Sequence, residues 1–240
     1  DGVKAALDAC FIGVDYYTCE YQIRHAEGYY IWVLDRGKVV QRDPDGRPAR
    51  IVGSIRNIDE RKRYEAEIHK LAFYDTLTEL PNRRLMTDRL QQALFKSVRS
   101  SQLGALMFID MDRFKDLNDT YGHAMGDLLL REVARRLSAC VRQQDTVARL
   151  GGDEFVVLLE HLTSTEKVAE IAAKLCSSVH APLPYGDQLL SIGMSVGVGV
   201  YPQDGDTLDQ LINSADRAMY QAKADPDQRV HFVSPPTAAG

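Results

Sequence analysis

Short apolar runs alternate with polar positions between Thr18 and Ile58. Turn-forming residues separate these runs at Glu27-Gly28, at Arg36-Gly37 and from Asp43 to Gly46. Alternation with a period of two, bounded by Gly, Pro and Asp, is typical of half-buried antiparallel strands. The pattern therefore predicts an antiparallel meander of about three strands.

The segment from Arg56 to Lys70 has a helical pattern instead. Charged residues of both signs crowd it, and Tyr64, Ile68 and Leu71 recur at helical spacing. Such spacing predicts a charged helix with one narrow apolar stripe. Its default role is that of a solvated connector. The alternative is a dimerising helix that couples the meander to the following domain, although so short a stripe does not establish a coiled coil.

Helix-like and strand-like segments alternate after Pro81. Asn82 is the expected N-cap of the first helix, because its side-chain oxygen can accept a hydrogen bond from a free N–H of the first turn. The Gly151-Gly152 pair predicts a hairpin, since glycine supplies the positive φ of tight turns. Helices are predicted over Arg83 to Arg99, Gly126 to Val141, Thr165 to Val179 and Leu208 to Ala224, and strands over Leu103 to Ile109, Thr146 to Leu150, Glu154 to Leu159, Leu189 to Tyr201 and Val230 to Val233. This order predicts an α/β domain with a mixed central sheet covered by helices.

The charge balance and hydropathy narrow the classes of partner. The 240 residues include 29 Lys or Arg and 34 Asp or Glu, which gives a formal net charge of −5. This mildly acidic balance disfavours a large nucleic-acid footprint, so no DNA partner is expected. No apolar run approaches the roughly 20 residues of a membrane span, so no membrane segment is expected in this chain.

The cysteines bear on the compartment. Cys10, Cys19, Cys140 and Cys176 show no CxxC pairing or metal-ligand spacing, which favours buried or surface thiols in a reducing environment. The residues from Asp1 onward contain neither a starting methionine nor a signal-peptide pattern. We therefore expect a cytoplasmic location, and membrane anchoring by upstream regions remains open.

Acidic residues stand at two places where chemistry is expected. Asp110 directly follows a buried strand, and a carboxylate there emerges at the edge of the sheet where ligands of open α/β sheets gather. Asp153 and Glu154 follow the predicted Gly-Gly turn. If the hairpin lies beside the strand, these acids can face Asp110 and supply the oxygen ligands that magnesium uses when it also holds phosphates. The alternative is that Asp153 and Glu154 only solubilise a turn.

The residues from Gly151 to Phe155 resemble, letter for letter, the signature of the GGDEF diguanylate cyclase family. Further motifs follow the family's order over about 160 residues, which argues against a chance match. Tyr74 to Arg83 resembles the opening motif, Phe108 to Asp119 the nucleotide motif, Tyr121 to Asp127 the segment after it, and Ala218 to Lys223 the late helix. The resemblance implies a palm-like fold related to nucleotidyl cyclases.

Residues 19 to 63 are similar to the C-terminal half of a PAS sensor domain, with a less specific pattern that ends at Asn57 to Lys62. The two resemblances imply a domain organisation. Residues 1–58 would be the C-terminal part of a PAS domain with an antiparallel sheet, 59–73 a linking signalling helix, 74–234 the GGDEF domain and 235–240 a linker-like tail.

The GGDEF resemblance implies an activity. Members of the family join two GTP molecules into cyclic di-GMP with loss of pyrophosphate, at the interface of a homodimer in which each subunit holds one GTP. By resemblance, Asp110, the carbonyl of Met111 and Asp153 would hold Mg²⁺, with Mn²⁺ as a possible substitute. Asp153 and Glu154 would activate the attacking hydroxyl. A metal-bound hydroxyl loses its proton more readily, and the same ion offsets charge on the phosphate.

The same resemblance implies substrate-binding residues. Asn118 and Asp127 match the guanine readers, and a carboxylate with an amide can satisfy guanine's N–H donors in a way that adenine cannot match. Lys115 and Lys223 match phosphate-binding lysines, and Phe114 belongs to the same substrate-binding motif. Gly151 and Gly152 would let the backbone approach the nucleotide without a Cβ in the way.

Two further features concern regulation and efficiency. Arg142 and Asp145 stand at the family's spacing before the hairpin, where Arg-x-x-Asp forms an inhibitory site for cyclic di-GMP; we expect them next to the hairpin, and the alternative is a plain helix end. After Lys223, Asp227 stands where the family usually has a phosphate-assisting arginine.

The leading interpretation is an active, product-inhibited cyclase. The alternatives are a catalytically weak domain that binds GTP or cyclic di-GMP as a regulatory module, and a dimerising sensor fragment for a downstream phosphodiesterase domain.

Overall fold

The computed structural model describes residues 4, 8–9, 12–100, 102–186, 188–225 and 227–235. The chain divides into two compact units, Asp1–His69 and Lys70–Gly240. Cys10 and the tail from residue 236 onward lie outside the described residues. Across the described part of the chain, no helix is both long enough and apolar enough to cross a membrane.

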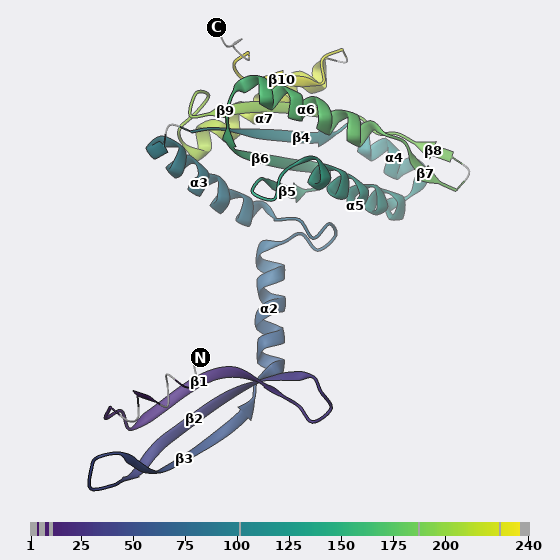
Figure 1. Ribbon diagram of the computed structural model, residues 1–240. Helices are drawn as coiled ribbons and strands as arrows, with labels where there is room; N and C mark the ends of the chain where they lie inside the picture. Colours follow the sequence, from purple (N-terminus) through teal and green to yellow (C-terminus); the bar gives the residue numbers. More distant parts are fainter. Residues whose placement is uncertain are drawn as a thin grey trace. The chain divides into compact units, whose positions relative to one another are not determined.

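The first unit is built on a three-stranded antiparallel sheet in the order β1-β2-β3 (Figure 1), which confirms the predicted meander. Its strands are β1 (Tyr16–Arg24), β2 (Tyr30–Arg42) and β3 (Pro48–Asn57). The turn predicted at Arg36-Gly37 is wrong, because β2 passes straight through it. A Cβ at Gly37 would lie 2.3 Å from the Tyr17 ring. This glycine therefore serves a close packing contact within the sheet rather than a turn.

The helix predicted after the meander is α2 (Asp59–Phe73). It begins at Asp59 rather than Arg56, because the residues before it belong to β3. Tyr64, Ile68 and Leu71 are all exposed on it, and a dimerising role for this stripe stays a prediction. Within the first unit, Glu20 of β1 accepts ion pairs from Arg61 at 2.5 Å and from Lys62 at 2.7 Å.

The second unit contains a five-stranded sheet in the order β10-β9-β4-β6-β5. The central strand β4 pairs antiparallel with β6 and β9, while β10 runs parallel to β9. This mixed sheet confirms the predicted fold class. The elements are α3 (Arg83–Ser100), β4 (Leu103–Met111), α4 (Phe114–Tyr121), α5 (His123–Cys140), β5 (Thr146–Gly151), β6 (Glu154–Leu162), α6 (Thr165–His180), β7 (Leu183–Tyr185), β8 (Gln188–Leu190), β9 (Met194–Tyr201), α7 (Leu208–Ala224) and β10 (Val230–Phe232).

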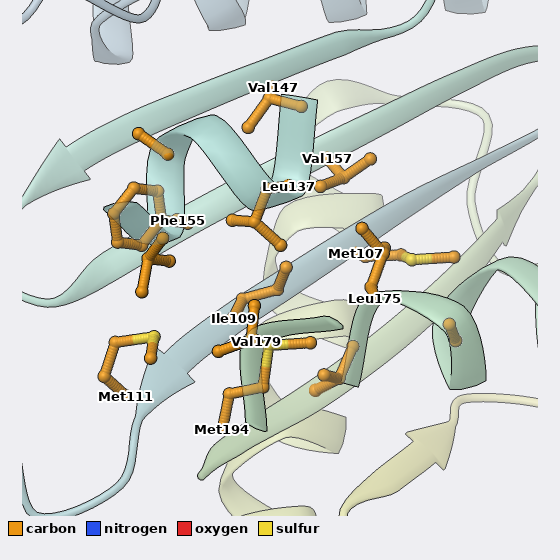
Figure 2. Close-up of a cluster of buried hydrophobic side chains, with 14 of the residues drawn as sticks. Met107, Ile109, Met111, Leu137, Val147, Phe155, Val157, Leu175, Val179 and Met194 are labelled. Atoms are coloured by element: carbon orange, nitrogen blue, oxygen red, sulfur yellow. The ribbon is translucent and has the colours of Figure 1, made fainter. Parts of the chain in front are cut away.

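Helices cover both faces of this sheet, and β4 supplies core residues to each face. Met107 and Ile109 point toward α5 and α6, where they pack against Leu137 and Leu175 in the cluster drawn in Figure 2. Residues of opposite parity, such as Phe108, pack against α3 and α7. A strand that is buried on both faces cannot move without disturbing two cores. The end of β4 is therefore a rigid platform for side chains.

Two local features differ from the expectations. The single strand predicted from Leu189 to Tyr201 is divided into β8, which pairs with β7 in a hairpin, and β9. The break includes Gly193, whose carbonyl accepts a hydrogen bond from the Asp112 N–H at 2.9 Å. Helix α4 was not predicted, and α5 begins three residues before Gly126, because Gly122, with φ 83°, joins the short helix α4 to α5 there. The N-cap prediction is confirmed, since Asn82 Oδ1 accepts from the Leu85 N–H at 3.2 Å.

Candidate functional site

The acids singled out in the sequence meet at one end of the central strand. Strand register places Asp110 opposite Glu154, and the Met111 N–H donates to the Asp153 carbonyl at 3.3 Å. The hairpin turn uses positive φ at Gly151 (141°) and Gly152 (53°), which glycine adopts without a Cβ penalty. The hairpin therefore lies beside β4, as the metal hypothesis required.

Burial makes it costly to keep the carboxylates of this cluster charged. Asp110 is 8% exposed, and burial together with the nearby Asp153 charge raises the pKa of its carboxyl group, although Lys223 acts in the opposite direction. The Lys223 ammonium donates to Asp110 Oδ1 at 2.7 Å, and this bond raises the pKa of Lys223. Carboxylates held together in a low-dielectric place need a positive charge. Lys223 supplies one here.

The donor set is compatible with a divalent ion that is shared with phosphates. Asp110 and Asp153 offer carboxylates, and the Met111 carbonyl offers a further oxygen at the end of the same strand. Among the described residues, no group of three or more His, Cys, Asp or Glu side chains is arranged to hold a metal. Magnesium usually takes one or two carboxylates and completes its shell with water and substrate phosphates. Asp110, Asp153 and the Met111 carbonyl fit that coordination preference.

The predicted guanine readers lie on the helices that follow β4. The Asn118 side chain of α4 lies over Gly126 of α5, where a Cβ would come within 1.9 Å of Asn118 Oδ1. That oxygen is buried and accepts no hydrogen bond from the part of the chain that the structure describes. A buried acceptor without a donor is costly unless a ligand supplies one. Asp127 is exposed on the next residue of α5.

The other predicted substrate residues divide into exposed and buried ones. Lys115 is exposed on α4. Phe114, at the start of that helix, is 9% exposed and belongs to the core cluster beneath α5. Its contact with the helix scaffold is a packing contact, in which the ring lies 3.1 Å from a Cβ built at Gly126.

A brace behind the hairpin was not assigned any role from the sequence. The Arg149 guanidinium donates to both Asp75 carboxylate oxygens at 2.9 and 3.0 Å, and to the Gly152 carbonyl at 3.0 and 2.7 Å. Hydrogen bonds from Thr78 and Arg149 outweigh burial and lower the pKa of Asp75. Asp75 stands inside the Tyr74 to Arg83 motif and Arg149 stands two positions before the Gly151 to Phe155 signature, which was the available signal. At the tip itself, Glu154 lies 3.6 Å from Arg83 in an ion pair.

The Arg142 to Asp145 pair lies elsewhere. Asp145 accepts from the Arg142 N–H at 2.9 Å and from the Glu160 N–H at 3.3 Å. Glu160 stands six positions along β6 from Glu154, or about 20 Å at the rise of a strand. The pair therefore lies at the base of the β5–β6 hairpin, and the length of that hairpin separates it from the Gly151-Gly152 turn. Its role as an inhibitory site stays a prediction. Arg142 itself is exposed.

The turn after α7 contains the departure at Asp227. Asp225 Oδ1 accepts from the backbone N–H groups of Asp227 at 3.0 Å and Gln228 at 3.3 Å. Such side-chain-to-backbone bonds fix a turn locally. The acidic residue is thus held in a short turn that directly follows the helix of Lys223.

Comparisons with known proteins agree with this geometry. The family model described as "Diguanylate cyclase, GGDEF domain" matches residues 72–229. The model described as "PAS fold" matches residues 1–55. The GGDEF match covers the second unit from just before the Asp75 turn to Arg229.

Curated relatives and solved structures point the same way. The bifunctional diguanylate cyclase/cyclic di-GMP phosphodiesterase MucR of Pseudomonas aeruginosa is 47% identical over 161 residues, which are 67% of this chain and 23% of MucR. Diguanylate cyclase TpbB of the same species is 42% identical over 159 residues, which are 66% of this chain and 37% of TpbB. This chain therefore spans well under half the length of these relatives.

Two solved structures share the fold of the second unit. The GGDEF domain of TpbB aligns with a TM-score of 0.65 at 40% identity, covering 67% of this chain and 94% of that one. The coiled coil and GGDEF domain of DgcB from Caulobacter crescentus, in complex with c-di-GMP, aligns with a TM-score of 0.65 at 25% identity, covering 73% and 93%. With the signature hairpin seated against the acidic end of β4 and the family model matching well over half of its residues, this chain belongs to the GGDEF family of diguanylate cyclases.

Proposed function

We propose that this chain condenses two molecules of GTP into cyclic di-GMP and two pyrophosphates. The observation that carries the proposal is the meeting of Asp110, Met111 and the Asp153-Glu154 hairpin beside Lys223. Acids for a metal and a hydroxyl, together with a cation for phosphate, are what phosphoryl transfer requires. The buried, unpaired Asn118 acceptor supports guanine as the base.

The proposed reaction proceeds in two equivalent transfers. In each, a 3′-oxygen attacks the α-phosphorus of the other GTP, the new P–O bond forms, and the bond to the β-phosphate breaks with release of pyrophosphate. A bound Mg²⁺ or Mn²⁺ at Asp110, the Met111 carbonyl and Asp153 would offset phosphate charge and acidify the hydroxyl. Glu154, which is 43% exposed, accepts the hydroxyl proton together with Asp153 and passes it to solvent.

The chemistry requires two copies of the chain. Each copy holds one GTP, so the two nucleotides must face each other across a twofold axis, and the same surface of each copy forms the contact. We propose a homodimer as the competent form. Because GTP is the substrate, we place the reaction in the cytoplasm.

Incubation of the chain with GTP and Mg²⁺, followed by anion-exchange chromatography, tests this proposal. We expect cyclic di-GMP and pyrophosphate to appear in a 1:2 ratio, at a rate that rises faster than linearly with protein concentration when dimers are scarce. GTP consumption without cyclic di-GMP would contradict the assignment. Tight binding of GTP or cyclic di-GMP without turnover would favour the regulatory-module alternative, which the acidic Asp227 after the Lys223 helix supports.

Replacement of Asn118 with alanine is expected to weaken GTP binding by roughly ten- to a hundredfold, since a guanine donor loses its partner. ATP binding should change little, so the preference for GTP falls by a similar factor. Asp127→Ala should act in the same direction. Competition binding with both nucleotides measures the preference, and an unchanged GTP/ATP ratio in both variants would move the guanine site elsewhere.

We propose that Arg142 and Asp145 bind cyclic di-GMP as an inhibitory site, and the cyclic di-GMP complex of DgcB supports product binding within the family. Because the pair lies away from the hairpin turn, Arg142→Ala should preserve the initial rate while removing a charge-assisted bond worth about 1.5–3 kcal/mol, or roughly tenfold or more in inhibitor affinity. Progress curves should stay linear for longer. Inhibition as strong as in the parent would assign it to another surface.

A further inference from the structure

Asp112, the second acid after the central strand, is held by three separate contacts. Its N–H donates to the Gly193 carbonyl at 2.9 Å, and its Oδ1 accepts from the Ser195 hydroxyl at 2.7 Å. Its Oδ2 lies 3.0 Å from an Arg229 guanidinium nitrogen in an ion pair. The carboxylate is 12% exposed and Ser195 is fully buried. These partners come from the β8–β9 connection, from β9 and from the residue just before β10.

This carboxylate is not one of the predicted metal ligands, and its packing holds it in one place. A Cβ built at Gly193 would lie 2.5 Å from Asp112 Oδ2, so the side chain is confined against that glycine. Within the described structure Oδ2 receives no hydrogen bond. The ion pair with Arg229 therefore compensates the negative charge of Asp112. A buried carboxylate in this state depends strongly on its cation.

The same contacts reach the predicted metal residues through the backbone. Asp112 directly follows Met111 and stands two positions after Asp110. Ser195 is the register partner of Asp110 on β9, and its hydroxyl reaches Asp112. Arg229 is anchored in turn, because its carbonyl accepts from the Val196 N–H at 2.8 Å. One set of bonds thus joins the end of β4, β9 and the segment after α7.

We infer that Asp112, Ser195 and Arg229 form a clamp whose role is to position Asp110 and the Met111 carbonyl, with Arg229 acting as a positioning residue that neutralises Asp112. The catalytic consequence rests on the proposed function. The clamp predicts that Arg229 acts through Asp112 and not through direct contact with the triphosphate. Arg229 stands two positions after Asp227, the site where the family usually has a phosphate-assisting arginine.

A double-mutant cycle tests the clamp. Arg229→Met leaves a buried, uncompensated carboxylate and should lower the melting temperature of the protein, without nucleotide or metal, by about 5 °C or more. Asp112→Asn combined with Arg229→Met leaves no buried charge and should recover most of that loss. Arg131→Met, at an exposed arginine on α5, is the matched control and should change neither melting temperature nor turnover.

Function is read on the same variants. Arg229→Met should weaken Mn²⁺ binding by about tenfold, measured by electron paramagnetic resonance in the presence of a non-hydrolysable GTP analogue. It should lower kcat by a similar factor, while KM for GTP changes less than about threefold. The double variant should recover both. A KM that rises in Arg229→Met and stays raised in the double variant would overturn the clamp in favour of a phosphate contact.

A second variant and the activity of the unaltered protein complete the test of the clamp. If Arg229→Met does not fold, Ser195→Ala removes a single hydrogen bond and should give smaller losses of Mn²⁺ affinity and kcat, again with little change in KM. Unchanged melting temperature and Mn²⁺ affinity in both single variants would overturn the clamp. Absence of cyclic di-GMP from the unaltered protein would refute the proposed function instead, because the melting and Mn²⁺ measurements do not require turnover.

Discussion

Replacement of Asp153 with alanine is expected to reduce cyclic di-GMP formation by about 1,000-fold or more, because one carboxylate at a phosphoryl-transfer centre contributes both to metal binding and to activation of the hydroxyl. The fold should survive, since Asp153 stands at a hairpin tip and contributes little to the core. Initial rates with GTP and Mg²⁺, together with circular dichroism melting curves, measure the two effects.

Asp206→Ala is the matched control, at an exposed acid in the loop between β9 and α7. It should leave both the rate and the melting curve unchanged. Glu154→Ala should lower turnover comparably, and its ion pair with Arg83 at 3.6 Å is too exposed to matter much for stability. Product formation at the parental rate in Asp153→Ala would remove the metal assignment altogether.

The local pattern of the sequence was sufficient for most of the fold. Period-two alternation and Gly-Gly punctuation identified the meander and the β5–β6 hairpin, because both depend on residues close in sequence. The two errors, a turn predicted at Arg36-Gly37 and a continuous strand predicted through Gly193, both involve a glycine. Each glycine packs against a residue that is distant in the sequence. Gly37 accommodates the ring of Tyr17 on the neighbouring strand, and Gly193 accommodates Asp112. A glycine signal alone does not distinguish a turn from a close approach.

The same distinction applies to the site. Asp110, Asp153 and Glu154 were recognisable because an acid after an apolar strand or at a hairpin turn is locally unusual. The residues that hold them in place were not recognisable, since their partners come together only in the folded sheet. Arg149 and Asp75 are 74 positions apart. Five strands and four helices separate Asp112 from Arg229 in the sequence. Charged pairs of this kind carry no periodic pattern that a single sequence reveals.

Arg149→Met is expected to destabilise the second unit by about 3–5 kcal/mol, the usual cost of breaking a buried ion pair from one side. The Arg149 side chain is 10% exposed and that of Asp75 is 20% exposed, so little water can replace the lost guanidinium. Asp75 would keep its bonds from Thr78 at 2.9 and 2.6 Å, but the Gly152 carbonyl would lose both of its bonds from Arg149. Urea unfolding measures this loss.

Turnover should fall further than stability alone explains, by about a hundredfold under conditions where the variant is fully folded. The Gly152 carbonyl immediately precedes Asp153, so release of the turn allows the catalytic hairpin to shift, and a displacement of about 1 Å can cost 10²-fold in rate. Arg149→Lys should recover little, because one ammonium cannot bond both the Asp75 carboxylate and the Gly152 carbonyl as the planar guanidinium does.

The pH dependence separates this brace from an ordinary surface pair. The pKa of Asp75 is lowered in the folded protein from an ordinary value of 3.8, so the stability that its carboxylate contributes is present above about pH 4 and is lost as the pH falls below that value. The difference in unfolding free energy between the parent and Asp75→Asn should therefore shrink on acidification. A folded Arg149→Met variant with parental turnover, or a difference that does not depend on pH, would show that the hairpin is positioned by its own strands and not by Arg149.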